Sequence, residues 1–220
     1  MSNPITLYID LMSQPSRAVY TFCLFNKIPH KVELVQVMKG QHLTPEYKRK
    51  NPLRRVPAID DNGFVLPESH AILRYLSNTL DVVDQWYPKD PKKRAMVDRY
   101  LDWHHSNTRR CSRYFLAEMK ELFPPGFITW TTESEKGLIE AAFRIIEDVF
   151  LKNRDYIASD DKMTIADLSA VCEIMQLRMT KFDFSKFPKL EAWINRCMSH
   201  PELQEAHKVL FKAAAAKPKL

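Results

Sequence analysis

The hydrophobic pattern of this chain changes near residue 80, and this change limits the possible folds more than any other feature. Before it, runs with every second residue apolar alternate with runs whose apolar residues recur every three or four positions. These are the periods of a strand and of a helix. After it, we find the helical period alone. The sequence therefore predicts an α/β unit followed by an all-helical unit.

The first eighty residues predict the order β-α-β-(α)-β-β-α. Strands are expected at 5–9, 32–37, 56–59 and 64–66, and helices at 17–27 and 68–80. The run Asp60-Asp61-Asn62-Gly63 predicts a tight hairpin turn between the last two strands. A connecting helix makes two strands parallel, whereas a hairpin makes them antiparallel, so we expect a mixed four-stranded sheet.

Prolines separate the expected elements, since the chain has 14 prolines and 4 glycines. Residues 81–91 contain Trp86-Tyr87-Pro88 and Asp90-Pro91, which predicts a linker between a domain at 1–80 and a domain at 92–220. Further helices are expected at 92–120 (with a bend), 133–151, 165–179, 187–199 and 201–216. The Thr164-Ile165-Ala166-Asp167 motif predicts a helix-capping box with a structural role.

The charge pattern argues against nucleic acid and membranes as partners. The net charge is +6, but the basic residues occur in short runs that are typical of solvated helix faces. No apolar run of the sequence approaches the ~20 residues that a membrane span requires. A net positive surface still attracts small anions in general.

The four cysteines of the sequence show neither a C-x-x-C pair nor the spacing of zinc ligands, so we expect no metal. They are Cys23, Cys111, Cys172 and Cys197. Without a signal peptide at the start of the sequence, reduced thiols in the cytoplasm are expected. The chain ends in Pro218-Lys219-Leu220, which differs at one residue from the Ser-Lys-Leu peroxisomal targeting signal. The peroxisome is therefore the alternative location.

Several stretches together resemble theta-class glutathione transferases, in order and from about Ile5 to about Leu210. They are Ser13-Gln14-Pro15-Ser16-Arg17-Ala18, Lys39-Gly40-Gln41-His42, Asn51-Pro52, Val56-Pro57-Ala58, Glu68-Ser69, Ala71-Ile72-Leu73, Trp86-Tyr87-Pro88, Trp103-His104-His105 and Ile165-Ala166-Asp167-Leu168. The serine hexapeptide indicates the theta class. Trp103-His104-His105 and the run from Ala166 to Leu177 resemble the plant representatives.

The resemblance implies an N-terminal thioredoxin-like domain and a C-terminal helical bundle. It also implies an enzyme that conjugates the glutathione thiolate to small electrophiles such as alkyl halides, aryl halides and isothiocyanates. Reduction of organic hydroperoxides is expected as a second activity. Glutathione acts as co-substrate with no further cofactor, and most family members are two-fold homodimers.

A free thiol is mostly protonated near neutral pH, and only the thiolate attacks, so the protein must stabilise the anion. Ser13 stands between a strand end and the helix that begins near Pro15, where its hydroxyl would donate to the sulfur. The alternative interpretation is that Ser13 only forms part of a turn or caps the helix. Tyr8 is the rival donor, and its own alternative is a packed aromatic.

The resemblance implies that glutathione binds along the first domain. Val56-Pro57 resembles a cis-proline turn whose exposed backbone pairs with the peptide. Ser69 and the N–H groups of its helix would hold the γ-glutamyl carboxylate, with Glu68 on the ligand's amino group. The remaining glutathione-binding residues are Gln14 and, toward the glycine carboxylate, Gln41, His42 and Arg55.

The electrophile is expected between the domains, against Met12, His105, Arg109 and Tyr114. Arg109 would steady an anionic leaving group, and its alternative is an exposed surface arginine. Theta enzymes usually carry a longer C-terminal segment over this pocket, so we expect a more open pocket here. Some relatives carry an aspartate near Ser106-Asn107 that reaches the glutathione bound by the partner subunit. Neither of these two residues is acidic in this chain.

Three other functions compete with this one. One is a glutathione-dependent peroxidase that uses the same site. Another is a non-catalytic glutathione or ligand binder. A thiol-disulfide reductase is disfavoured because no cysteine occupies the Ser13 region and Cys23 falls inside the first expected helix.

Overall fold

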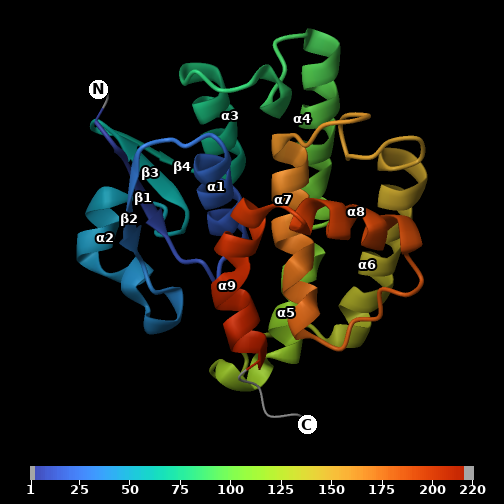
Figure 1. Ribbon diagram of the computed structural model, residues 1–220. Coiled ribbons are helices and arrows are strands. Elements are labelled where there is room, and N and C mark those ends of the chain that lie inside the picture. The colour runs from blue at the N-terminus through green and yellow to red at the C-terminus, as the bar shows by residue number, and fades with distance from the viewer. Residues whose placement is uncertain (1–2, 216–220) are drawn as a thin grey trace.

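The computed structural model describes residues 3–215 and has a sheet-containing unit beside a helical unit (Figure 1). The strands are β1 (Ile5–Ile9), β2 (His30–Leu34), β3 (Ala58–Asp61) and β4 (Phe64–Pro67), in the order β2-β1-β3-β4. β1 pairs in parallel with β2 and antiparallel with β3, which pairs antiparallel with β4. The predicted mixed four-stranded sheet is confirmed.

Helices cover both faces of this sheet. They are α1 (Gln14–Phe25), α2 (Pro45–Lys50) and α3 (Ser69–Thr79), with short 3-10 turns η1 (Val37–Lys39), η2 (Gln41–Leu43) and η3 (Asp84–Trp86). In Figure 1, α1 and α3 lie on the side of the helical unit, whereas α2 lies on the outer side. Leu7 and Ile9 belong to the core that includes α1, while Tyr8 belongs to a small cluster with Tyr47. This follows from the alternation of side chains along a strand.

The helical unit follows η3. Its elements are α4 (Pro91–Ser106), α5 (Arg110–Glu118), η4 (Lys120–Leu122), α6 (Thr132–Ile145), a π-helical turn η5 (Ile146–Phe150), α7 (Ile165–Ile174), a 3-10 turn η6 (Met175–Met179), α8 (Pro188–Met198) and α9 (Pro201–Ala215). The expectations for residues 216–220, including Pro218-Lys219-Leu220, lie outside the described residues.

The expectation of one bent helix over 92–120 is wrong, because two separate helices meet at Asn107. The Asn107 amide donates to the Trp103 carbonyl at 2.8 Å, and the Thr108 hydroxyl lies 3.0 Å from the hydroxyl of Tyr100. Polar side chains that bond locally or to the core compete with the helical ladder. This break is important because Arg109 follows it directly and begins the turn into α5.

α7 runs through the middle of the molecule, where all ten of its residues are buried (Figure 1). The predicted capping box is present, since Asp167 accepts from the backbone N–H of Thr164 at 2.9 Å. Asp167 also accepts from the indole N–H of Trp193 at 3.0 Å. One apolar core extends from β1 through α1 to α7, so the two units share it.

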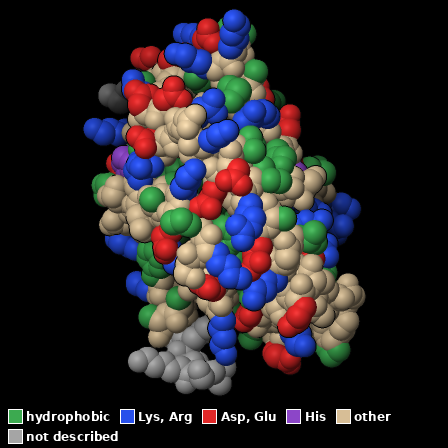
Figure 2. Space-filling view, turned by 90° about the vertical axis from the view of Figure 1, so that its right-hand side faces the viewer, with side chains coloured by type: hydrophobic (Ala, Val, Ile, Leu, Met, Phe, Trp, Pro, Cys, Tyr) green, Lys and Arg blue, Asp and Glu red, His purple; other side chains and the backbone are tan. Residues whose placement is uncertain are grey.

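The surface beyond α6 and α8 carries both signs of charge. Figure 2 shows that lysine and arginine side chains alternate with aspartate and glutamate over this face, and that hydrophobic side chains are scattered between them. Within residues 3–215, no helix is both long and apolar enough to cross a bilayer.

Candidate active site

A cavity of about 150 Å³ opens between the two units. Its first wall comes from the sheet-containing unit, and its second wall from α4, the α4–α5 junction and α7. The lining residues are Gln14, Pro15, Arg55, Val56, Pro57, Glu68, Ser69 and His70 on the first wall, and His104, His105, Arg109, Ser169 and Glu173 on the second. We call this cavity the cleft.

The cleft brings together most of the residues that the sequence singles out. Gln14, Arg55, Val56, Pro57, Glu68, Ser69, His105 and Arg109 line it. Ser13 lies directly before Gln14, next to the cleft lining. Gln41 and His42 lie in η2, where the Gln41 side chain accepts from the backbone N–H of Gln36 at 2.8 Å.

Ser13 occupies the N-cap position of α1 with an extended backbone, φ −80° and ψ 121°. Within the described part of the chain, its hydroxyl makes no capping hydrogen bond to the helix. Its backbone N–H donates to the Asp10 carbonyl at 2.8 Å, which closes the loop between β1 and α1. The hydroxyl is therefore not engaged as a cap and is free to meet a ligand at the helix N-terminus.

The loop that carries Ser13 is fixed on one side by Asp10. The Asp10 carboxylate accepts from the backbone N–H of Met12 and from that of Val37, both at 2.9 Å. These two bonds tie the loop to η1 across the end of the sheet. Met12 itself is partly buried and packs against the main core.

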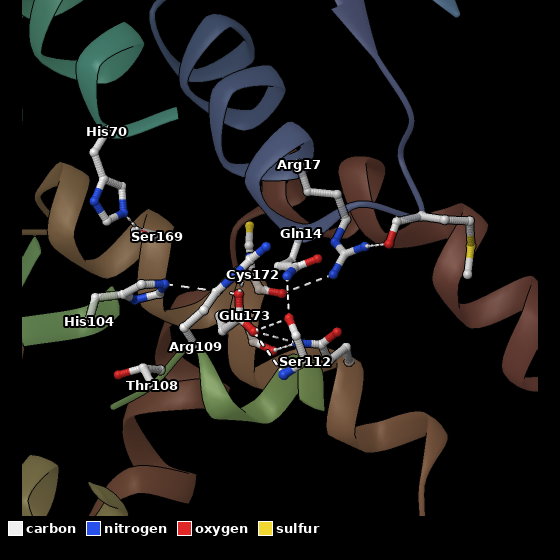
Figure 3. Close-up of polar contacts among 12 residues, drawn as sticks. Gln14, Arg17, His70, His104, Thr108, Arg109, Ser112, Ser169, Cys172 and Glu173 are labelled. Carbon is white, nitrogen blue, oxygen red and sulfur yellow. Dashed lines mark hydrogen bonds and ion pairs between the residues drawn. The ribbon is translucent and has the colours of Figure 1, made fainter. Parts of the chain in front are cut away.

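The same loop is fixed on the other side by Arg17, which is fully buried in α1. Its guanidinium donates to the carbonyls of Leu11 at 2.8 Å, Met12 at 3.1 Å and Cys172 at 2.9 Å (Figure 3). Burial lowers the pKa of Arg17. Carbonyl dipoles rather than a carboxylate hold this cation, and they join the Ser13 loop to α7.

The segment before Val56 is held through its backbone. The carbonyl of Arg55 accepts from the Tyr47 hydroxyl and from the Asn51 amide, both at 2.8 Å. The Val56–Pro57 peptide bond is cis, as expected. The backbone carbonyl of Arg55 is thus fixed, whereas the Arg55 side chain is exposed at the cleft.

Ser69 begins α3 at the cleft, directly after a residue with unusual backbone angles. Glu68 has φ 75° and ψ 108°, a region that a non-glycine residue seldom adopts, at a cost of about 1–3 kcal/mol. Such residues cluster at binding sites, where the surroundings impose them. His70 then anchors α3, because its Nε2 lies 2.6 Å from the Ser169 hydroxyl on α7.

The second wall presents side chains from the end of α4 and the start of α5. Arg109 donates to Glu173 at 2.9 Å and keeps 42% of its side chain exposed. His105 is exposed, with its ring centre 4.6 Å from that of His70. Tyr114 is instead 5% exposed and packs against Phe182 in the core, so it lies outside the cleft lining.

Tyr8, the rival donor, lies on the opposite face of the sheet from α1. Its ring packs against Tyr47 at 6.2 Å, with the Lys50 ammonium 5.0 Å above it. Burial raises the pKa of the Tyr8 hydroxyl. This geometry favours its reading as a packed aromatic.

The cysteines are four buried free thiols. Burial raises the pKa of Cys23 and of Cys172 to about 12, so the reactive thiolate is strongly disfavoured at both. This argues further against a thiol-disulfide reductase that would use them.

Sequence reasoning missed a group of polar residues in the cleft lining and next to it, namely His70, His104, Ser112, Ser169, Glu173 and Gln176. Ser169 and Glu173 stand four residues apart in the mostly apolar run from Ile165 to Leu177. Positions i and i+4 share one face of a helix. That spacing was the available signal for a polar face on α7.

Comparisons with known proteins agree on one family. The family model "Glutathione S-transferase, N-terminal domain" matches residues 13–79, and "Glutathione S-transferase, C-terminal domain" matches residues 130–201. Mouse glutathione S-transferase theta-3 is 38% identical, over 97% of this chain and 91% of that protein. Glutathione S-transferase T1 of Arabidopsis thaliana is 40% identical, over 94% and 89%. The animal and the plant relative are thus similarly distant.

A solved structure extends the agreement to the fold. A human theta-class glutathione transferase, in complex with the glutathione conjugate of 1-menaphthyl sulfate, superposes with a TM-score of 0.87. The two chains are 35% identical, and the alignment covers 97% of this chain and 89% of the other. The thioredoxin-like first domain and the helical second domain that the sequence predicts are confirmed.

Proposed function

This chain belongs to the glutathione S-transferase family, and from that premise we propose that it conjugates the thiolate of glutathione to small electrophiles. One observation carries the proposal: α1 and α3 both begin at the same cleft, opposite Arg109 and His105. Helix N-termini favour anions. Bound glutathione carries carboxylates and, when reactive, a thiolate.

Glutathione would lie along the first wall. The γ-glutamyl carboxylate would meet the Ser69 hydroxyl and the first N–H groups of α3, with Glu68 beside the ligand's ammonium group. The Val56 backbone would pair with the cysteinyl peptide like an added strand. The glycine carboxylate would extend toward Arg55, with Gln41 and His42 beyond it.

The sulfur would then reach the N-terminus of α1 near Ser13. The thiol releases its proton to solvent, and the Ser13 hydroxyl donates a hydrogen bond to the resulting thiolate. The helix N-terminus adds about 0.5–1 kcal/mol in favour of the anion. The thiolate attacks the electrophilic carbon, and the leaving group departs with the electron pair of the broken bond.

The second wall would receive the electrophile. Arg109 is a cation that faces the cleft, which suits alkyl and aryl halides and sulfate esters that release an anion. The conjugate in the related human structure comes from an aromatic sulfate ester, which supports this class. Isothiocyanates would react at the same thiolate by addition. Organic hydroperoxides would be reduced by two glutathiones to an alcohol, water and glutathione disulfide.

Calorimetry with S-hexylglutathione, followed by a panel of electrophiles, tests the proposal. We expect binding, and turnover of at least one of an alkyl halide, an aryl halide, an isothiocyanate and cumene hydroperoxide. Loss of glutathione consumption in the Ser13→Ala variant would link the turnover to the proposed site. Absence of binding overturns the proposal, whereas binding without turnover would indicate a glutathione carrier.

We also propose that the protein forms a homodimer in the cytoplasm. The edge strand β4 leaves Phe64 half-exposed against Tyr75, an apolar surface suited to a second copy. Four free thiols agree with a reducing compartment. Sedimentation velocity should give a dimer that Phe64→Lys weakens, and a fluorescent fusion with a free C-terminus should distinguish cytoplasm from peroxisome.

A further inference from the structure

Glu173 is a carboxylate in a helix that is otherwise built for the core. It is 1% exposed, and every other residue of α7 is also buried. Burying a charge is costly unless it is well paired, and an apolar residue of similar size often serves a core equally well. Packing alone therefore does not account for Glu173.

Both oxygens of this carboxylate are occupied. Oε1 accepts from the backbone N–H of Ser112 at 3.0 Å, from the Ser112 hydroxyl at 2.5 Å and from the Gln176 amide at 2.7 Å. Oε2 accepts from the Arg109 guanidinium at 2.9 Å. Figure 3 shows Ser112 of α5 and Arg109 of the α4–α5 junction converging on Glu173, with His104 of α4 also directed toward it.

These donors lead to the two walls of the cleft. Arg109 belongs to the second wall. Ser112 accepts a hydrogen bond from the amide of Gln14, which is the first residue of α1 and follows Ser13 directly. One buried carboxylate is thus connected to the residue beside the thiolate site and to the cation on the opposite wall (Figure 3).

We propose that Glu173 is a positioning residue that holds Arg109 toward the leaving group and, through Ser112, holds Gln14 and the start of α1 in place. The inference rests on the proposed function of the cleft. A single carboxylate restricts the guanidinium on one side and leaves its other N–H groups for the anion that develops. Placement of such groups controls rate strongly, since a misplacement of about 1 Å can cost about 100-fold.

Two substrate classes separate this role from a general effect on the site. With an arylmethyl sulfate, the sulfur–carbon bond forms, the carbon–oxygen bond breaks and sulfate leaves with the electron pair. With an isothiocyanate, the thiolate adds to the central carbon and the nitrogen takes a proton from water, so no anion leaves. Arg109 should matter for the first class and little for the second.

The variant Glu173→Gln tests the contact with Arg109. Its amide oxygen can still accept from Ser112, whereas its NH₂ group faces the guanidinium and cannot accept from it. We expect kcat for the arylmethyl sulfate to fall about five- to tenfold, up to the loss expected when Arg109 itself is removed. Turnover of the isothiocyanate and the KM for glutathione should stay within about threefold of wild type.

Glu135 provides a matched control on another helix. Its carboxylate is 3% exposed and pairs with Arg110 at 3.2 Å and Arg113 at 2.7 Å, and all three residues lie outside the cleft lining. Glu135→Gln therefore also removes a buried charge beside arginines of α5. It should leave the ratio of the two substrate rates at the wild-type value.

The double variant Arg109→Met with Glu173→Gln tests whether Glu173 acts through Arg109. We expect it to be no slower on the sulfate than Arg109→Met alone. Equal loss on both substrate classes in Glu173→Gln, or additive losses in the double variant, would overturn the proposal. A wild-type protein that turns over neither substrate would instead contradict the proposed function.

Ser112→Ala carries the test if Glu173→Gln does not fold, as judged by circular dichroism. This change removes the hydroxyl that accepts from the Gln14 amide, and it leaves the Glu173 carboxylate in place. We expect it to slow both substrate classes by about threefold or more, because both depend on the start of α1. Wild-type rates for both classes in Ser112→Ala would contradict the link between Glu173 and the thiolate side.

Discussion

The first wall of the cleft is held mainly through its backbone, whereas the second wall is presented by side chains. Tyr47 and Asn51 fix the Arg55 carbonyl, and Arg17 fixes the carbonyls of the Ser13 loop. On the second wall, Arg109 reaches the cleft from the junction of α4 and α5. A wall whose backbone is fixed by buried side chains keeps one shape, so the first wall suits one constant ligand. A side-chain site changes with single substitutions, which suits a variable partner.

Replacing Ser13 should produce the largest loss of activity, and the loss should be similar for every electrophile. Ser13→Ala removes one donor to the anion, and we expect kcat/KM to fall about 10²- to 10³-fold for each substrate. Tyr8→Phe, a change on the other face of the sheet, should stay near the wild-type value. Steady-state kinetics with a halide and an isothiocyanate provide the measurement, and the opposite pattern would reassign the donor.

Acid should destabilise the folded protein through histidines that are buried within the described residues, one at the cleft and one away from it. Burial lowers the pKa of His70 to about 3 and, away from the cleft, that of His207 to about 3, against an ordinary value of 6.5. Above pH 6.5 both histidines are neutral in the folded and in the unfolded chain. Between pH 6.5 and pH 3 the unfolded chain takes up protons that the folded chain excludes. Each histidine should thus cost about 2 kcal/mol of unfolding free energy at pH 5.

Urea titrations at pH 7 and pH 5 measure that change. His70→Gln and His207→Gln should each reduce the difference between the two pH values by about 2 kcal/mol. Equal reductions would show that burial, and not the cleft, sets the acid sensitivity. An unchanged difference in both variants would contradict the account.

Arg109 should affect only part of the substrate range. Arg109→Met should slow substrates that release an anion by about tenfold, because one charge-assisted hydrogen bond is lost, and leave isothiocyanates nearly unchanged. Arg113→Met is the matched control, since Arg113 also lies on α5 but pairs with Glu135. A uniform slowing of both classes by Arg109→Met would remove the distinction between the two walls.

Tyr47 should give the smallest effect and should act on glutathione alone. Tyr47→Phe removes the hydroxyl that donates to the Arg55 carbonyl at 2.8 Å, a bond worth about 1 kcal/mol. We expect the KM for glutathione to rise about fivefold, with the KM for the electrophile unchanged. Tyr87→Phe, which loses a bond to Asp98 outside the cleft lining, should change neither constant.

The fold was largely predictable from the sequence because its signals are local. Alternation in β1, the proline at the start of α1 and the Asn62-Gly63 turn each depend on a few neighbouring residues. The same holds for the Thr164 capping box. The break at Asn107 was missed because Thr108 finds its partner, Tyr100, only in the folded core.

Motifs of the sequence lie at the cleft, since Val56-Pro57 and Glu68-Ser69 line it and Ser13 comes directly before the lining residue Gln14, while their roles toward glutathione stay predictions. Tyr114 was expected at the cleft, but its helix turns it into the core against Phe182. The Glu173 network escaped sequence reasoning because its members lie up to 162 positions apart along the chain, from Gln14 to Gln176. Their relation depends on the packing of α1 and α5 against α7.

The central claim is that Ser13, at the start of α1, keeps the sulfur of bound glutathione as a thiolate. A pH titration of the near-ultraviolet thiolate absorbance of the enzyme–glutathione complex tests it directly. The account predicts a thiol pKa well below that of free glutathione in wild type, and a value close to that of free glutathione in Ser13→Ala. The same lowered pKa in both proteins would contradict it.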